Sequence, residues 1–224
     1  MDADTGIEMV AVPPGRVTLS DRRTRTSWQV ELAPYRLAAV PVTQAGYARV
    51  TGRRPSAARG DLLPVESVSW LDAVRFCNDL SRREGLAPAY RLGGGAEDVE
   101  WDASSGGYRL PTEAEWEHAC RAGTTGARYG PLDEIAWHRG NSGEAIRDVG
   151  GRRPNAWGLH DMLGDVWEWC WDLYDAEVYG SYRVLRGGGW FDEHWSCRAS
   201  VRRRSHPTFQ TDDVGFRVAR SVTG

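Results

Sequence analysis

The chain has 224 residues, 41% of them hydrophobic, which is enough for one compact domain with a substantial core. Its 28 basic and 31 acidic residues leave a net charge of -3, which argues against recruitment to nucleic acid or an anionic membrane through overall charge. No apolar run approaches the roughly 20 residues that cross a bilayer, and Met1–Asp4 lacks the basic and apolar regions of a secretory signal. We therefore expect one cytoplasmic domain over residues 1–224, with neither a nucleic-acid nor a membrane partner.

The first elements are short. Met9–Gly15 followed by Val17–Leu19 predicts a small opening hairpin, and Trp28–Leu32 predicts a strand with alternating faces. Thr43 can then cap a helix that continues to about Thr51.

Two further helices have clearer signatures. After Ser69, apolar residues recur at helical spacing until Gly85 supplies a stop. These apolar residues are Trp70, Ala73, Val74, Cys77 and Leu80. In the next helix Thr112 and Glu115 can form a capping box, and Gly123 ends the helix. Beyond Gly123 the pattern indicates only short strands and glycine-rich loops, so the predicted fold class is α+β.

The tryptophan and cysteine residues indicate how the core is held together. Eleven tryptophans in one chain predict a compact domain held together by aromatic packing. The cysteines lie far apart and show no paired metal-ligand spacing, so we expect neither a zinc ribbon nor required disulfides. They are Cys77, Cys120, Cys170 and Cys197.

Five ordered motifs, spread over nearly the whole chain, resemble those of the formylglycine-generating enzyme (sulfatase-modifying factor) family. They are Tyr108–Glu117 (YRLPTEAEWE), Asn155–Leu159 (NAWGL), Gly164–Trp169 (GDVWEW), Arg186–Trp190 (RGGGW) and Gly215–Arg217 (GFR). The resemblance implies a modified C-type-lectin-like fold, low in regular secondary structure and stabilised by calcium. Family members include oxidases that convert a peptide cysteine to formylglycine, sulfoxide synthases, tailoring enzymes of peptide natural products, and proteins without known chemistry.

The resemblance also implies where calcium would bind. Its ligands fall on the side chains of Asp161 and Glu168 and on the carbonyl groups of Gly164 and Val166. Calcium binds six to eight oxygens and mixes carboxylates with carbonyls and water, which suits this set. Without a cation Glu168 would be a charged residue among tryptophans and without a partner, so we expect a structural calcium. The alternative is that Asp161 and Glu168 are ordinary turn and strand carboxylates.

The chain departs from the formylglycine-generating branch at its copper site. That branch has two cysteines, five residues apart, after the Arg-Gly-Gly motif. In this chain the second position is Cys197 but the first is Asp192, and Gly189 replaces a small polar residue. One thiolate and one carboxylate do not supply the two-sulfur coordination that copper(I) prefers. Copper-dependent conversion of cysteine to formylglycine is therefore not expected.

A dense polar segment replaces the copper site and supplies the candidate catalytic residues. They are Asp192, Glu193, His194 and Cys197. If the segment is extended, Asp192 and His194 share one face and could bind a hard or borderline metal, with Glu193 or His206 as third donor. The alternative is a hydrogen-bond network within a loop. The sequence does not identify a redox metal.

Cys197 has two interpretations. The adjacent Arg198 could favour its thiolate, which is the nucleophilic form. Alternatively, Cys197 is a small structural residue in a strand that leads into Ala199–Val201.

The sequence leaves three functions open. The working hypothesis is a tailoring enzyme, an oxidoreductase that oxidises or rearranges a small molecule or peptide in a concave pocket. Asp192 and Glu193 would act as metal ligands or general bases, and Trp190 and Arg198 would bind the substrate. A non-catalytic ligand- or peptide-binding module would instead present a flat aromatic and basic surface. The third function is an assembly or regulatory protein, and the sequence does not fix the oligomeric state.

Overall fold

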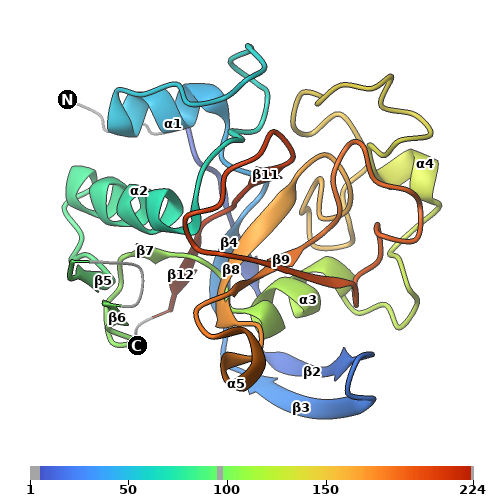
Figure 1. Ribbon diagram of the computed structural model, residues 1–224, viewed down its shortest axis with the longest axis horizontal. Helices are drawn as coiled ribbons and strands as arrows, with labels where there is room; N and C mark the ends of the chain where they lie inside the picture. Colours follow the sequence, from blue (N-terminus) through green and yellow to red (C-terminus); the bar gives the residue numbers. More distant parts are fainter. Residues whose placement is uncertain (1–5, 95–97, 223–224) are drawn as a thin grey trace.

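The computed structural model describes residues 6–94 and 98–222, and Met1–Asp4, on which the expectation about a secretory signal rests, lies outside them. Short helices and strands alternate with long loops (Figure 1). The helices are α1 (Gln44–Thr51), α2 (Trp70–Arg83), α3 (Glu113–Arg121), α4 (Leu132–Ile135) and α5 (Ala176–Tyr179). The strands are β1 (Met9–Val12), β2 (Gly15–Asp21), β3 (Thr26–Leu32), β4 (Tyr35–Ala38), β5 (Tyr90–Leu92), β6 (Val99–Trp101), β7 (Tyr108–Arg109), β8 (Trp167–Leu173), β9 (Arg183–Arg186), β10 (Arg202–Ser205), β11 (Val214–Gly215) and β12 (Ala219–Ser221). No helix of the described residues is long and apolar enough to span a membrane.

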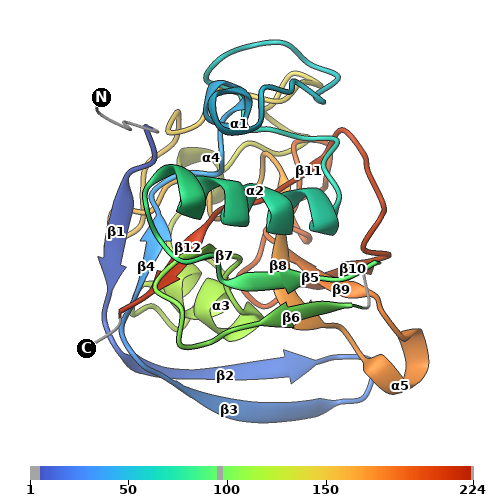
Figure 2. The same ribbon diagram turned by 90° about the vertical axis from the view of Figure 1, so that its left-hand side faces the viewer.

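Two four-stranded sheets organise the domain. One has the order β1-β4-β12-β7 and is antiparallel throughout, with β12 between β4 and β7. The other has the order β10-β9-β8-β11, and its β8 and β11 run in parallel with Val214 opposite Trp167. Separate two-stranded ribbons are formed by β2 with β3 and by β5 with β6, and the β2–β3 ribbon lies along the α3 side of the molecule (Figure 2). The fold class is α+β, as predicted.

The three longer helices begin where the sequence predicted. The side-chain oxygens of Thr43, Ser69 and Thr112 each accept a hydrogen bond from the backbone of the first turn, at 3.1, 3.1 and 3.2 Å. The Glu115 carboxylate also accepts from the Thr112 N–H at 2.8 Å, which completes the predicted capping box. At the end of α3, Ala122 and the predicted stop Gly123 both have left-handed backbone, with φ of 43° and 85°.

The predicted opening hairpin is wrong. Met9 lies opposite Ala38, so β1 pairs with β4, whereas β2 pairs with β3 and places Gly15 opposite Leu32. Pro13 separates the two strands and has no N–H to donate to a strand ladder, and each strand finds its partner farther along the chain. The strand at Trp28–Leu32 is confirmed as part of β3, but its side chains are mostly exposed, because the ribbon covers only a small cluster beside α3.

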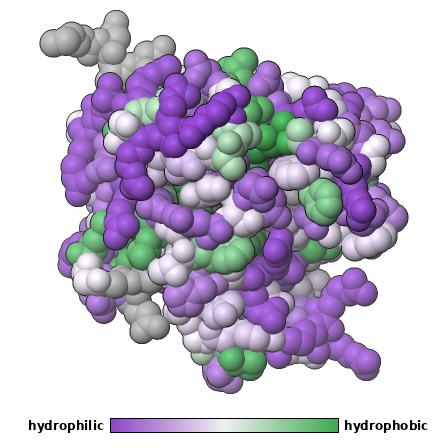
Figure 3. Space-filling model, turned by 45° about the horizontal axis from the view of Figure 1, so that its top comes forward, coloured by the Kyte–Doolittle hydropathy of each residue, from purple (hydrophilic) through white to green (hydrophobic). Residues whose placement is uncertain are grey.

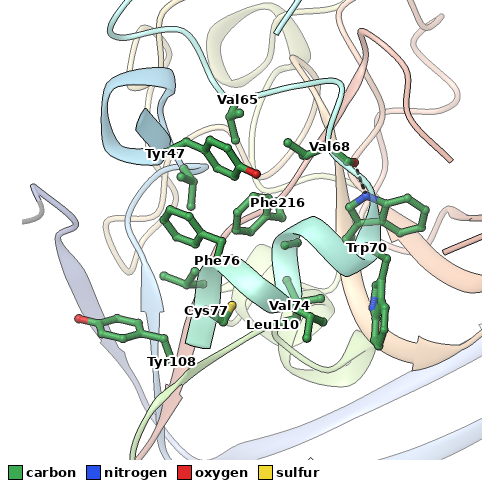
Figure 4. Close-up of a cluster of buried hydrophobic side chains, with 14 of the residues drawn as sticks. Tyr47, Val65, Val68, Trp70, Val74, Phe76, Cys77, Tyr108, Leu110 and Phe216 are labelled. Carbon is green, nitrogen blue, oxygen red and sulfur yellow. Dashed lines mark hydrogen bonds between the residues drawn. The ribbon is translucent and has the colours of Figure 1, made fainter. Parts of the chain in front are cut away.

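Aromatic side chains fill the main core, as the tryptophan content predicted (Figure 4). The Tyr47 and Phe76 rings stack at 5.3 Å between centroids, and Phe216 meets Phe76 edge-on at 5.2 Å. Trp169 Nε1 donates to the Val68 carbonyl at 3.0 Å, so this buried indole has its hydrogen-bond partner. All four cysteines are buried and unpaired. On the face shown in Figure 3, hydrophobic residues form separate patches within a mostly hydrophilic surface.

Candidate functional site

The segment that carries the candidate catalytic residues leaves β9 through a glycine run. Gly187 and Gly188 have φ of 105° and 87°, in the region that L-residues with a side chain rarely adopt. The chain then folds into turns instead of continuing as a strand: the Asp192 N–H donates to the Gly189 carbonyl at 3.0 Å. The expectation that Asp192 and His194 share one face of an extended segment is therefore wrong.

Asp192 points inward. Its Oδ2 accepts from Trp167 Nε1 at 2.6 Å and from the Gly189 N–H at 2.9 Å. A Cβ at Gly189 would lie 3.4 Å from the Asp192 carboxylate, and one at Gly188 would lie 3.0 Å from Cys197 Sγ. The structure thus brings Asp192 and Cys197 together around the glycine run. The carboxylate itself holds the loop, which is the hydrogen-bond network that stood as the alternative to a metal ligand.

Cys197 is a buried thiol. Burial, together with the negative charge of Asp192, raises its pKa to about 12, so it is protonated at neutral pH. Arg128, not Arg198, supplies the nearby positive charge, and Arg128 Nε donates to the Cys197 carbonyl at 2.9 Å. Cys197 lies among turns before β10 and not in the predicted strand. These features fit a structural residue and not a nucleophile.

The remaining candidates face solvent. Glu193 forms an ion pair with Arg139 at 3.3 Å, and exposed His194 meets the Trp195 ring edge-on at 5.0 Å. Trp190 is half-buried and donates from Nε1 to the Asp212 carbonyl at 3.2 Å.

Among the described residues, these side chains do not form the expected metal site. Clefts of 360 to 590 Å³ elsewhere in the described residues include none of the four candidate catalytic residues. His206 donates to or accepts from Thr208 Oγ1 at 2.8 Å and contacts the Tyr182 ring. Across residues 6–94 and 98–222, no three or more His, Cys, Asp or Glu side chains are grouped to hold a metal ion. Arg198 is half-buried, and its Nε has no hydrogen-bond partner.

Glu168 has a partner that the sequence did not reveal. Arg217 donates from Nε to Oε2 and from Nη2 to Oε1, each at 2.7 Å, and Trp116 Nε1 also donates to Oε2 at 2.8 Å. All three side chains are buried. The argument that Glu168 would lack a partner without calcium is therefore wrong, because a guanidinium neutralises it. Arg217 and Trp116 fill three of the roughly four acceptor positions of this carboxylate, which leaves one position on Oε1 for a further ligand.

Asp161 fits a cation better than Glu168 does. It is buried, and although its Oδ2 accepts from the Gly150 N–H at 2.6 Å, its Oδ1 has no hydrogen-bond partner. Gly164 packs so closely on Trp137 that a Cβ would lie 2.1 Å from that carbonyl oxygen, and Val166 is buried beside it. Burial raises the pKa of Asp161, so its charge calls for compensation that the described side chains supply only in part.

Sequence analysis missed one charged cleft. Asp172, Glu113 and Arg202 line a cavity of about 460 Å³ between the β2–β3 ribbon and the start of α3. Asp172 Oδ2 accepts from the Glu113 N–H at 2.6 Å, and Arg202 Nη2 donates to Glu113 Oε2 at 2.8 Å. Burial, then the charge of Glu113, raises the pKa of Asp172 to about 6. The three residues come from separate segments, so no local spacing could have indicated them.

The sheets, the scarce regular structure and the loop-borne glycine run define a C-type-lectin-like domain of the formylglycine-generating-enzyme type. Residues 2–222 match the model of the sulfatase-modifying factor enzyme 1-like domain, and the chain belongs to this family. The resemblance drawn from the five motifs is thereby confirmed.

The names of its relatives indicate different functions. Chaperone protein LppX of Paenibacillus barcinonensis is 30% identical, over 86% of this chain and 82% of its own length. The formylglycine-generating enzyme of Streptomyces coelicolor is 31% identical, over 76% of this chain and 58% of its own length. Among solved structures, Treponema denticola variable protein 1 is 31% identical with a TM-score of 0.87, over 95% of this chain and 94% of its own. Family membership therefore does not by itself select an activity.

Proposed function

We propose that this chain is a binding member of its family that recognises a polypeptide segment through residues 190–195, here called the aromatic loop. One observation carries the proposal: the Phe191 and Trp195 side chains are 51% and 56% exposed, whereas the carboxylate of Asp192 and the thiol of Cys197 in the same region face inward. The rings of the loop are thus exposed to solvent, whereas the reactive groups of this region are turned away from solvent.

The aromatic loop has the chemistry of a recognition surface. The Arg139 guanidinium lies over the Phe191 ring at 5.0 Å and also pairs with Glu193 at 3.3 Å, so it fixes the ring and adds a charged border. Exposed rings beside arginine and histidine are typical of surfaces that bury apolar side chains of a partner inside a polar rim. An extended polypeptide with apolar and acidic side chains is complementary to this arrangement. One relative, LppX, is named a chaperone protein, and chaperones bind polypeptides.

We also propose the cellular location of the protein and its cofactor. Four unpaired, buried cysteines are consistent with a reducing compartment, so we place the protein in the cytoplasm. Neither nucleic acid nor a membrane is needed as partner. A structural calcium belongs to the proposal, with Asp161 Oδ1 and the carbonyl groups of Gly164 and Val166 among its ligands.

A second candidate function is the tailoring reaction, oxidation or rearrangement of a small molecule or peptide. It is favoured by the proximity of Asp192 and Cys197 around Gly188–Gly189, in a family that includes formylglycine-generating enzymes. In that function Trp190 and Arg198 would bind the substrate.

A peptide-display selection separates the two candidates. A library of displayed dodecapeptides is selected on the wild-type protein, and the affinities of enriched peptides are measured by fluorescence anisotropy. Trp195→Ser and Phe191→Ser should each weaken binding by about 2 kcal/mol, roughly 30-fold, as expected for aromatic residues at the centre of an interface.

The matched controls leave the rings in place. Glu193→Gln changes only the exposed charge, and Cys197→Ser removes the thiol, so both should bind the selected peptides within about threefold of wild type. Enriched peptides that bind all four variants equally would refute recognition by the aromatic loop. Covalent modification of a bound peptide that disappears in Cys197→Ser would instead support the tailoring reaction.

A further inference from the structure

Two arginine-rich segments that lie far apart in the sequence meet beside α5. One is the turn between β2 and β3, residues 22–25, and the other is β10. The guanidinium carbons of Arg23 and Arg204 both lie over the Tyr179 ring, at 5.6 and 3.7 Å from its centroid. The surface they share is here called the arginine–tyrosine face, and it consists of Arg22, Arg23, Tyr174, Tyr179 and Arg204.

Two arginines in this region are neutralised by acids of the protein itself. Arg202 Nη2 donates to Glu113 Oε2 at 2.8 Å. Arg23 forms an ion pair with Asp175 at the start of α5. The charges of these two guanidinium groups are therefore compensated within the domain.

Arg204 has no such partner. No carboxylate oxygen in the part of the chain that the structure describes lies within 4 Å of its guanidinium, and no atom there accepts a hydrogen bond from it. The half-buried side chain is held instead by two rings, with the guanidinium carbon 3.7 Å from the centroid of Tyr179 and 5.1 Å from that of Tyr174. This packing restricts the guanidinium before any ligand arrives, and it leaves the N–H donors available.

The available donors suit a carboxylate. A planar guanidinium can pair with both oxygens of a carboxylate, and hydrogen bonds between charged groups are the stronger ones. Exposed Arg22 adds a second positive charge, and it lines a cleft of about 360 Å³ together with Tyr174. β10 is the outermost strand of its sheet, so no further strand of the described residues covers Arg204.

We propose that the arginine–tyrosine face binds an acidic segment of a polypeptide, with one carboxylate on the guanidinium of Arg204 and a neighbouring carboxylate near Arg22. Successive acidic side chains would supply the negative charge that the surrounding side chains do not, which is the complementarity that selects partners at charged interfaces. Glu177, the exposed acid of α5, is not within 4 Å of the Arg204 guanidinium. The face shares no residue with the aromatic loop, so the inference does not depend on the proposed function.

A labelled acidic peptide tests the inference on the full chain. The probe is fluorescein-labelled hexaglutamate with an amidated C-terminus, and its binding is followed by fluorescence anisotropy at about 50 mM salt, where charge pairing is only partly screened. Arg204→Gln should weaken binding at least about tenfold. Arg204→Lys keeps the charge but loses the planar fork, and it should weaken binding about threefold or more. Arg22→Gln, at an exposed position, should weaken binding about threefold.

Matched controls separate this face from net charge and from the aromatic loop. Arg83→Gln removes one exposed arginine at the end of α2, a helix that lies apart from α5 in both views (Figures 1 and 2). It should bind hexaglutamate within about twofold of wild type. Trp195→Ser should bind the probe as wild type does, whatever its effect on the peptides selected for the aromatic loop.

Four results would overturn the inference. One is wild-type protein that does not bind hexaglutamate at about 1 mM. Another is equal weakening in Arg83→Gln and Arg204→Gln, which would leave only the net charge of the protein as the cause. A third is a hexaalanine peptide with a free C-terminal carboxylate that competes as well as unlabelled hexaglutamate, because the ligand would then be a chain end. The last is wild-type binding in both Arg204→Lys and Arg22→Gln while Arg204→Gln melts far below wild type, which would assign Arg204 a purely structural role.

Discussion

The buried pair of Glu168 and Arg217 makes a strong prediction about stability. In Glu168→Gln the side-chain shape is kept, but the charge that compensates Arg217 is lost. The new amide N–H₂ group must also face either Arg217 or Trp116, both of which are donors. Breaking a buried ion pair by removing one partner costs about 3 to 5 kcal/mol. In a chain of this length that corresponds to a fall in Tm of about 6 to 20 °C.

Urea denaturation measures this effect. Glu168→Gln should lower the midpoint without changing the slope, whereas Glu193→Gln, which loses an exposed pair with Arg139, should change stability by less than about 1 kcal/mol. The double variant Glu168→Gln with Arg217→Met should lose less than the sum of the two single variants, because no uncompensated charge remains. If Glu168→Gln costs no more than Glu193→Gln, the guanidinium is not the partner that stabilises Glu168.

Three further predictions concern single residues. Cys197 should resist maleimide in the native protein at pH 8 and react after denaturation, because its thiol is buried and its pKa is raised to about 12; rapid native labelling would contradict this. The pKa of Asp172, about 6, lies above its unfolded value, so the folded state binds more protons and stability falls as pH rises from about 4 to 6; Asp172→Asn should remove about 1 to 3 kcal/mol of that fall in urea titrations. Gly164→Ala should cost more than about 2 kcal/mol, because its Cβ would lie 2.1 Å from the Trp137 carbonyl oxygen. Gly158→Ala, with φ 85° and no atom within 4 Å, should cost only about 1 kcal/mol in the same denaturation assay.

Features that depend on near neighbours in sequence could be predicted. The helix starts at Ser69 and Thr112 are encoded by residues three positions apart, which form reciprocal hydrogen bonds whatever the rest of the chain does. The pairing of β1 with β4 could not be predicted in this way. Met9 meets Ala38 across an intervening ribbon, and no local pattern specifies that partner.

The candidate site shows the same limit. The motifs identified the family, and the glycine run lies beside Cys197 in the structure. The direction in which each side chain points depends on contacts from other segments. Trp167 donates to Asp192 and holds its carboxylate inward, and Arg217, which is 49 positions away in the sequence, pairs with Glu168. The Glu168 carboxylate, for which the sequence predicted a calcium partner, is paired with the Arg217 guanidinium.

The position of β12 has a consequence for how the protein is made. Ala219–Ser221 fills the gap between β4 and β7, both of which are synthesised long before it. Until β12 has been synthesised, the edges of β4 and β7 that it joins stay open to unwanted pairing, which favours aggregation. Nascent chains stalled before Ala219 should therefore be more sensitive to protease at β4 and β7 than chains that include β12.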